Sequence, residues 1–253
     1  MNSDLQAIYV MWQRQMKRFL RARSRLVANV VQPFFFLAIL GFGLAPAKFP
    51  GIPPEFGYLD FLTPGIITMA VIFSSAFTGV SILWDRQFGF LQEVLVAPVR
   101  RVSIVVGRTL GGSTISLIQG LTIVAVAGLL GVEPDPLGIL PTVGFMILIA
   151  FTFVGFGILL ASRMEDIHGF QLIMNLVMMP LIFLSSAFFP MDYVPGWLRL
   201  VMVLDPLTYG VDGIRGCLLG FSYFPLWLDA SVILGLCVLM IALGSYSFSK
   251  SEV

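Results

Sequence analysis

Residues 137–161 read LGILPTVGFMILIAFTFVGFGILLA and contain no Asp, Glu, Lys, Arg or His. At about 1.5 Å per residue, a helix of this length exceeds the ~30 Å hydrocarbon core of a bilayer. Hydrocarbon offers the backbone no hydrogen-bond partners, so a run this apolar is expected to cross the membrane as a helix. Lipid is therefore the solvent in which the fold has to be explained.

The rest of the chain follows the same pattern. It is 58% hydrophobic and 11% charged, whereas soluble domains are roughly 45–50% apolar and about 25% charged. Further apolar runs occupy residues 26–45, 61–83, 110–130, 170–189 and 228–248. We therefore expect an all-α polytopic membrane protein with six transmembrane helices. It would form one membrane domain over residues 26–253, preceded by an N-terminal helix over residues 1–25.

The N-terminal segment is amphipathic. Apolar side chains fall on one face of the expected helix and basic side chains on the opposite face. Such a helix is expected to lie at the membrane surface, with its basic side toward anionic headgroups. A solvated helix packed on protein is the alternative. The residues assigned to this interfacial helix are Trp12, Arg14, Lys17, Arg18 and Arg21.

Residues 191–225 differ from the other connecting segments. Prolines, glycines and charged residues alternate here with apolar pieces, at 197–204 and 207–219, that are too short to cross a membrane. Backbone that enters the membrane without forming a complete span must be buried in protein or line water. We therefore expect re-entrant or interfacial half-helices before the last span.

The basic residues predict the orientation. All but three of the 15 Lys and Arg residues lie in the N-terminal segment, residues 84–108, the turn at 163–168 or the C-terminal tail. Cytoplasmic loops are enriched in Lys and Arg, so both termini are predicted to be cytoplasmic. The interval 191–225 would then lie at the outer face.

Several classes of protein are excluded or disfavoured. The lone His168 lies beside Glu165 and Asp166, and Cys217 and Cys237 show no metal-ligand spacing, so no catalytic or metal site is expected. No G-x-x-x-x-G-K-[ST] phosphate loop occurs, so any ATP must be bound by another subunit. The spans contain almost no ionisable side chains, which argues against an ion-coupled carrier. A net charge of +1 gives no indication of nucleic-acid binding.

The loop at residues 84–101 reads WDRQFGFLQEVLVAPVRR. Phe88, Leu91 and Leu95 fall at helical spacing, Pro98 ends the helix and a basic pair follows. This pattern predicts a short amphipathic helix on the cytoplasmic side. A purely structural loop is the alternative, but a rigid helix with an exposed apolar stripe is what a soluble partner needs to push on.

The loop resembles the segment of ABC-type exporter permeases with the pattern acid-Arg-x-x-Gly-Thr-x-x-Glu-x-Leu-x-x-Pro-x-x-Arg, with Phe90 at the common Thr position. Residues 179–192, 195–198 and 205–215 are similar to the end of the fifth span and the outer re-entrant helices of the daunorubicin-resistance and nodulation-factor exporter permeases. With the six-span layout, the resemblance covers almost the whole chain. The positions that match the loop pattern are Asp85, Arg86, Gly89, Glu93, Leu95, Pro98 and Arg101.

The resemblance implies a type-2 ABC permease subunit in the inner cell membrane, paired with a separate ATPase dimer and a second copy of the permease. The chain itself would bind no cofactor, because ATP and Mg²⁺ belong to the ATPase. ATP binding would close the ATPase dimer, the loop would transmit that motion, and the second and fifth spans of two protomers would reshape a central pathway. The expected cargo is hydrophobic or amphipathic: a drug, a lipid or a lipid-linked glycan.

Three groups of site residues are predicted for such a permease. ATPase coupling is assigned to Asp85, Arg86, Phe88, Gly89, Leu91, Glu93, Leu95, Pro98 and Arg101. The substrate pathway is assigned to Phe73, Ser74, Phe77, Met174, Asn175, Met178, Phe183, Ser185 and Ser186. An outer gate is assigned to Asp205, Pro206, Tyr209, Asp212 and Arg215, the last two being spaced to pair on a helix.

Alternative interpretations of the predicted pathway residues and of the function remain open. Met and Phe stripes also pack against lipid or neighbouring helices without lining a pathway, and small residues allow helices to approach closely. At the level of the whole protein, the alternatives are a scaffold or receptor that carries no flux, and an ion-coupled secondary carrier.

Overall fold

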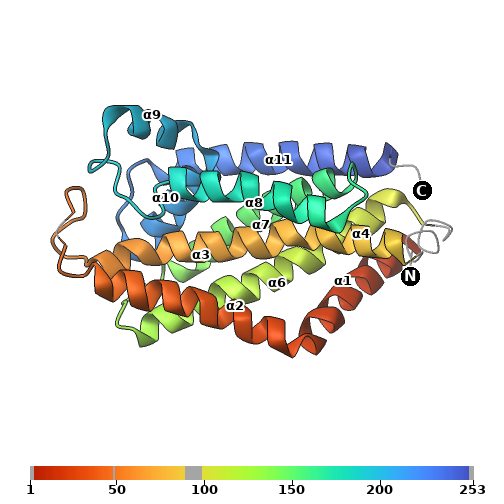
Figure 1. Cartoon of the computed structure of the whole chain (residues 1–253), viewed down its shortest axis with the longest axis horizontal. Helices are drawn as coiled ribbons and strands as arrows, with labels where there is room; N and C mark the ends of the chain where they lie inside the picture. The colour runs from red at the N-terminus through yellow and green to blue at the C-terminus, as the bar shows by residue number, and fades with distance from the viewer. Residues whose placement is uncertain (1–2, 48, 89–98, 251–253) are drawn as a thin grey trace.

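A computed structural model describes residues 3–47, 49–88 and 99–250, without the side chains of residues 23–26, 28–30 and 101. In this part of the chain the regular structure is helical and contains no strand, as expected. α1 begins and α11 ends at the same end of the bundle, which we call the α1 end (Figure 1). The opposite end, which we call the α9 end, carries α9 and α10.

The helices follow one another in a simple order. They are α1 (Ser3–Arg21), α2 (Arg23–Phe36), η1 (Leu37–Phe42), α3 (Tyr58–Ala76), η2 (Phe77–Gly79), α4 (Val80–Gln87), α6 (Arg101–Leu129), α7 (Ile139–Ala161), α8 (Ile167–Leu184), α9 (Gly196–Leu204), α10 (Pro206–Leu219) and α11 (Leu226–Lys250). The π-helix η1 continues α2, and the 3-10 turn η2 joins α3 to α4.

Five continuous helices in the described residues are long and apolar enough to cross a membrane. They are Tyr58–Gln87, Val102–Leu129, Ile139–Ala161, Ile167–Leu184 and Leu226–Lys250. Each corresponds to one of the predicted spans. The remaining prediction, residues 26–45, falls on α2 and η1, where the described apolar stretch is the shorter Val31–Phe42. The count of six spans therefore remains a prediction for this first segment.

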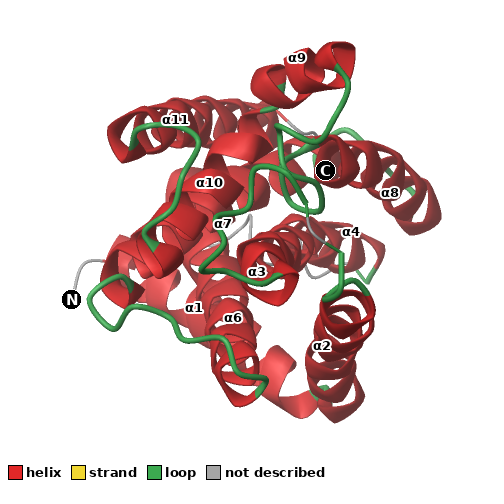
Figure 2. Ribbon diagram, turned by 90° about the vertical axis from the view of Figure 1, so that its left-hand side faces the viewer, coloured by secondary structure: helices red, strands yellow, loops and turns green. Residues whose placement is uncertain are grey.

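The helix formed by α3, η2 and α4 is the centre of the bundle. Figure 2 looks along the bundle and shows α3 surrounded by α2, α6, α7 and α8. In the most apolar part of this helix, 78% of the residues are buried inside the protein, compared with 17% for α11. The packing is close where small residues meet: a side chain at Gly79 would collide with the backbone of Gly157, and one at Gly244 with that of Gly155.

The N-terminal helix α1 packs along α6. Gly107 and Gly111 leave room on α6 for Met11 and Gln15, so the two helices approach closely. Trp12 also donates a hydrogen bond from Nε1 to Thr114 Oγ1 at 3.2 Å. The contact with α6 corresponds to the alternative of a helix packed on protein.

The half-helices α9 and α10 begin and end close to the predicted pieces 197–204 and 207–219. Asp205 caps α10, because its Oδ1 accepts a hydrogen bond from the backbone N of Leu207 at 2.8 Å. Gly220 ends the helix with a φ of 71°, a left-handed conformation that suits glycine. Most of α10 is buried against α11, α7 and α3.

Candidate functional site

A cavity of about 480 Å³ lies beside the central helix. Its walls come from α1, α2, α3, η2, α4, α6 and α8, and its volume is in the range typical of small-molecule sites. The wall mixes aromatic rings with amides and hydroxyls. The polar lining residues are Gln15, Arg18, Gln32, Ser74, Thr78, Ser81, Gln119, Gln171 and Asn175.

Four of the residues predicted to line a pathway meet at this cavity. Phe73, Ser74 and Phe77 line it from the central helix, and Asn175 lines it from α8. The rings of Phe73 and Phe77 stack with their centroids 6.1 Å apart. The second and fifth predicted spans therefore share one wall of this cavity within a single chain. Their predicted meeting across two protomers stays a prediction.

The other five predicted pathway residues lie elsewhere. Met174 and Met178 are fully buried in the hydrophobic core. Phe183 is half exposed and stacks on Phe188, with the ring centroids 5.1 Å apart. Ser185 and Ser186 are buried beyond the end of α8, toward the α9 end.

Sequence reasoning missed the glutamines that line the cavity. Gln32, Gln119 and Gln171 each lie in a largely apolar helix, and Met179 adds a thioether to the same wall. A signal was present, because a polar side chain in a membrane-spanning segment tends to face the protein interior or a water-filled space. The prediction included Ser74 and Asn175 among the pathway residues but none of the glutamines.

A buried ion cluster lies next to the cavity and is centred on Asp85. Arg14 donates two hydrogen bonds to this carboxylate, at 2.9 and 2.5 Å, and Arg108 donates one at 2.6 Å. Arg18 lies 3.6 Å from the same carboxylate. Asp85 is only 2% exposed. The basic face of α1, which was expected to face headgroups, therefore directs two of its arginines at Asp85.

The predicted coupling segment is only partly described. Asp85 is buried in the ion cluster, Arg86 donates to the carbonyl oxygen of Met164 at 3.0 Å, and Phe88 is 83% exposed. Gly89, Leu91, Glu93, Leu95 and Pro98 lie outside the described residues, as does the side chain of Arg101. The exposed Phe88 is compatible with a docking role, whereas Asp85 faces the protein interior.

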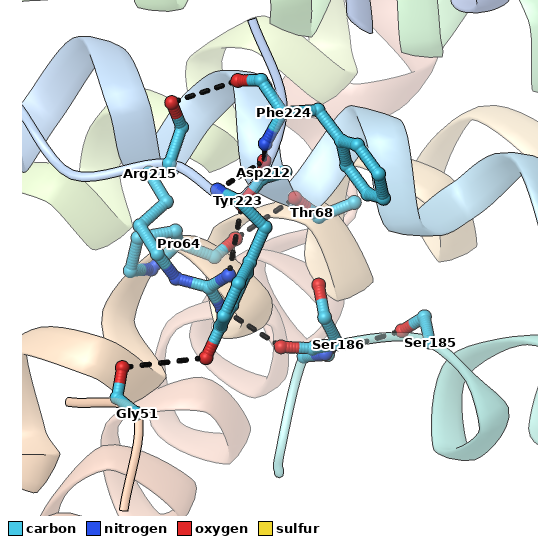
Figure 3. A network of polar contacts seen from close by, with 11 residues as sticks. Gly51, Pro64, Thr68, Ser185, Ser186, Asp212, Arg215, Tyr223 and Phe224 are labelled. Carbon is cyan, nitrogen blue, oxygen red and sulfur yellow. Dashed lines mark hydrogen bonds and ion pairs between the residues drawn. The ribbon is translucent and has the colours of Figure 1, made fainter. Parts of the chain in front are cut away.

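Two of the predicted outer-gate residues, Asp212 and Arg215, take part in a network of polar contacts (Figure 3). Arg215 lies 3.3 Å from Asp212 Oδ1 and donates to the carbonyl oxygen of Ser186 at 2.7 Å. Its guanidinium carbon lies 4.0 Å from the centroid of the Phe61 ring, a cation–π contact. The Oδ2 atom of Asp212 accepts hydrogen bonds from the backbone N of Tyr223 and of Phe224, both at 2.8 Å.

This network joins segments that are far apart in the sequence. Arg215 and Asp212 belong to α10, Ser186 follows α8, and Tyr223 precedes α11. Tyr223 also donates its hydroxyl to the carbonyl oxygen of Gly51, at 3.5 Å. The network therefore holds the α9 end together as one unit.

The remaining predicted residues border these two clusters. Tyr209 donates its hydroxyl to the carbonyl oxygen of Val203 at 2.9 Å, and Pro206 is the first residue of α10. Burial raises the pKa of Asp205 to about 7, although the hydrogen bond from Leu207 opposes this effect. Lys17 and Arg21 are exposed and line a shallow hollow on α1.

Comparison with known proteins gives a consistent result. A family model described as "ABC-2 type transporter" matches residues 6–219. The transport permease ycf38 of Pyropia yezoensis is 32% identical over 223 residues, which cover 85% of this chain and 74% of the relative. The daunorubicin resistance ABC transporter permease protein DrrB1 of Streptomyces coeruleorubidus is 27% identical over 218 residues, covering 83% of this chain and 74% of the relative.

A bacterial transport permease is similar to this chain over a larger share of its own length. The inner membrane transport permease YadH of Escherichia coli K12 is 27% identical over 223 residues, covering 87% of this chain and 86% of the relative. The match to the family model extends from α1 to the end of α10 and so includes the cavity, the Asp85 cluster and the pair Asp212 and Arg215. This chain belongs to the ABC-2 type transporter family of membrane permeases.

Proposed function

We propose that this chain is the membrane subunit of an ATP-driven exporter that moves a hydrophobic or amphipathic cargo out of the cytoplasm. In this proposal it lies in the inner cell membrane with both termini cytoplasmic. Two copies would pair with a separate ATPase dimer that binds ATP and Mg²⁺. A drug, a lipid and a lipid-linked glycan are all cargoes of the required chemistry.

The observation that carries this proposal is the cavity beside the central helix. Its aromatic rings and the thioethers of Met69 and Met179 suit an apolar body, and its amides and hydroxyls suit a polar group. Gln171 and Asn175 lie one helical turn apart on α8, and both face this space. A cavity with this lining can hold an amphiphile without fixing a single orientation.

Two further features support the proposal: one concerns the pairing of two copies and the other concerns coupling to the ATPase. Leu172 and Leu176 on α8 are more than 70% exposed, so this face of the helix is available to a second copy or to lipid. α4 ends at Gln87 and α6 begins at Arg101, so the predicted coupling loop connects two helices that hold the Asp85 cluster. A movement of that loop would be transmitted to the cavity through α4, because Ser81 and Trp84 of α4 line the cavity.

Reconstitution tests the proposal. The chain should show no ATPase activity alone, and liposomes that contain it with its co-purifying ATPase should move a lipophilic probe only with ATP and Mg²⁺. ATP-dependent movement would contradict the scaffold alternative, and movement driven by an ion gradient without ATP would support the secondary carrier. Repeated failure to recover an ATPase from native membranes would argue against the exporter.

Asn175→Trp tests the cavity. The indole would fill space beside Phe73 and Phe77, so ATP-dependent transport should be abolished while the protein stays folded. Val238→Trp places the same ring on α11, at a side chain that is 62% exposed and does not line the cavity, and is the matched control. Equal transport by both variants would show that cargo does not pass through this cavity.

Glu93→Lys tests the coupling loop. Reversing the charge should uncouple ATP hydrolysis from transport without unfolding the protein. Glu133→Lys makes the same change in an exposed loop between α6 and α7, and it should leave coupling intact. Normal export by the Glu93 variant would remove the assignment of this loop to ATPase coupling.

A further inference from the structure

Asp229 is a buried acid that the proposed transport path does not use. It lies in the first turn of α11 and is 0% exposed. Both of its carboxylate oxygens are buried without a hydrogen-bond partner among the described residues. Deprotonated carboxylates are rarely left in this condition, because removing an unpaired charge from water is very costly.

The charged side chains near Asp229 leave the site with more negative than positive charge. Asp229 lies within electrostatic range of Asp212 and Arg215. Arg215 is already engaged by Asp212, by the carbonyl oxygen of Ser186 and by the ring of Phe61. Two carboxylates therefore share one guanidinium in a site from which solvent is excluded.

The other elements around Asp229 supply no charge to balance it. α7, which packs most extensively on α11, has no ionisable side chain between Ile139 and Ala161. On α10 the remaining titratable groups are Tyr209 and Cys217, and in the loop before α11 the titratable group is Tyr223. Glu133 and Asp135, in the loop before α7, are exposed and also acidic. The basic side chain described on α6, Arg108, does not balance Asp229 either, because it lies at the α1 end and pairs with Asp85.

Other unpartnered oxygens lie on the helices that converge on this site. Thr142 is in the first turn of α7 and Thr208 is in the first turn of α10, and the hydroxyl of each is buried without a hydrogen-bond partner among the described residues. α7 and α11 both start at the α9 end and run side by side (Figure 1). These hydroxyls and the Asp229 carboxylate are thus buried oxygen groups near the starts of three helices, α7, α10 and α11, that pack on one another.

We propose that Asp229 binds a monovalent cation, either a proton or a sodium ion, which neutralises the buried cluster that it forms with Asp212 and Arg215. The bound cation stabilises the contact of α10 with the start of α11 and so keeps the α9 end closed. Loss of the cation leaves a buried negative charge, which draws water between the two helices. This cation site is additional to the exporter function and does not depend on it.

Thermal unfolding of the purified protein tests the site. Asp205 is a second buried acid in this region, so the measurements use an Asp205→Asn background. In choline chloride, the melting temperature should fall by roughly 5 °C between pH 6 and pH 8 if a proton is the ligand. If sodium is the ligand, replacing choline with sodium at pH 8 should restore the loss.

Asp229→Asn separates this site from other titrating groups. The amide has nearly the same shape and carries no charge, so its melting temperature should be independent of pH and of sodium in this range. Asp135→Asn, an exposed acid at the same end, is the matched control and should behave like the parent. An unchanged response in the Asp229 variant would overturn the proposal, as would a parent that responds to neither ion.

Cysteine labelling gives a second test that needs no substitution. Cys217 lies near Asp229, and Cys237 is equally buried further along α11. Loss of the cation should raise the rate of maleimide labelling at Cys217 several-fold relative to Cys237, as measured by mass spectrometry. Equal changes at both cysteines would contradict opening at this site.

Discussion

The two buried arginine clusters, at opposite ends of the bundle, have opposite charge ratios. In the Asp85 cluster, one carboxylate lies within reach of Arg14, Arg18 and Arg108. In the Arg215 network, one guanidinium serves Asp212 and lies within electrostatic range of Asp229. The side chains of Arg14 and Arg18 are 29% and 36% exposed, whereas Asp212, Arg215 and Asp229 are fully buried.

This difference in exposure decides what each cluster can do. Partly exposed arginines remain solvated, so an excess of positive charge near Asp85 has a moderate energetic cost. An excess of negative charge around Arg215 has no such relief, because Asp212, Arg215 and Asp229 are fully buried. The Arg215 network should therefore respond more strongly to loss of a partner than the Asp85 cluster.

The largest effect is expected for Arg215→Leu. Removing the guanidinium leaves Asp212 without its ion-pair partner and breaks the bond to Ser186, so the free energy of unfolding should fall by about 3–5 kcal/mol. The measurement is thermal unfolding of the detergent-solubilised protein. Arg199→Leu breaks an exposed ion pair at the same end, with Asp192 at 3.4 Å, and should change stability by less than about 1 kcal/mol. Similar losses in both variants would contradict the comparison.

A smaller loss is expected for Asp85→Asn. Arg108, which is 1% exposed, would lose a charge-assisted hydrogen bond worth about 1.5–3 kcal/mol, but its neighbours Arg14 and Arg18 can turn toward water. The same unfolding assay measures the loss. Adding Arg108→Gln should recover part of it, because the uncompensated buried charge is then gone. No recovery in the double variant would show that Asp85 acts through other contacts.

The smallest effect is a pH dependence due to Asp205. The pKa of Asp205 is raised to about 7 by burial, so the folded state holds the proton more tightly than the unfolded chain does. Stability from this group is complete below pH 4 and is lost as the pH rises toward 7. Asp205→Asn keeps the acceptor that caps α10, and its melting temperature should exceed that of the parent by a few degrees at pH 8 and match it at pH 4. A constant difference at all pH values would exclude titration of Asp205 as the cause.

Local features could be predicted from sequence where local chemistry decides them. α9 and α10 begin and end near the predicted residues because Pro195, Pro206 and Gly220 interrupt the helices regardless of tertiary context. The long apolar runs were equally clear, since only a helix satisfies their backbone in lipid.

Features that depend on distant partners could not be predicted. The central helix continues through Trp84, Asp85 and Arg86, beyond the predicted end of the span, and Asp85 is neutralised by Arg14 and Arg108 from other helices. Sequence periodicity gives no information on such pairs. It likewise could not distinguish Met174, which faces the core, from Asn175, which faces the cavity, because that choice depends on how α8 is rotated against α3.

The 3-10 turn η2 lies where the wall of the cavity meets the close contact with α7. Phe77 and Thr78 line the cavity, and Gly79 has its backbone against Gly157 on α7, so this point of the central helix cannot slide. It can pivot, because a short tighter turn inside an α-helix is a common place for a change of direction. The eight-residue helix α4 would then rotate about the contact with Gly157. Because Asp85 lies near the end of α4 and binds Arg14, α1 would move with it. In the proposed exporter, a small movement of the predicted coupling loop would in this way widen or narrow the cavity.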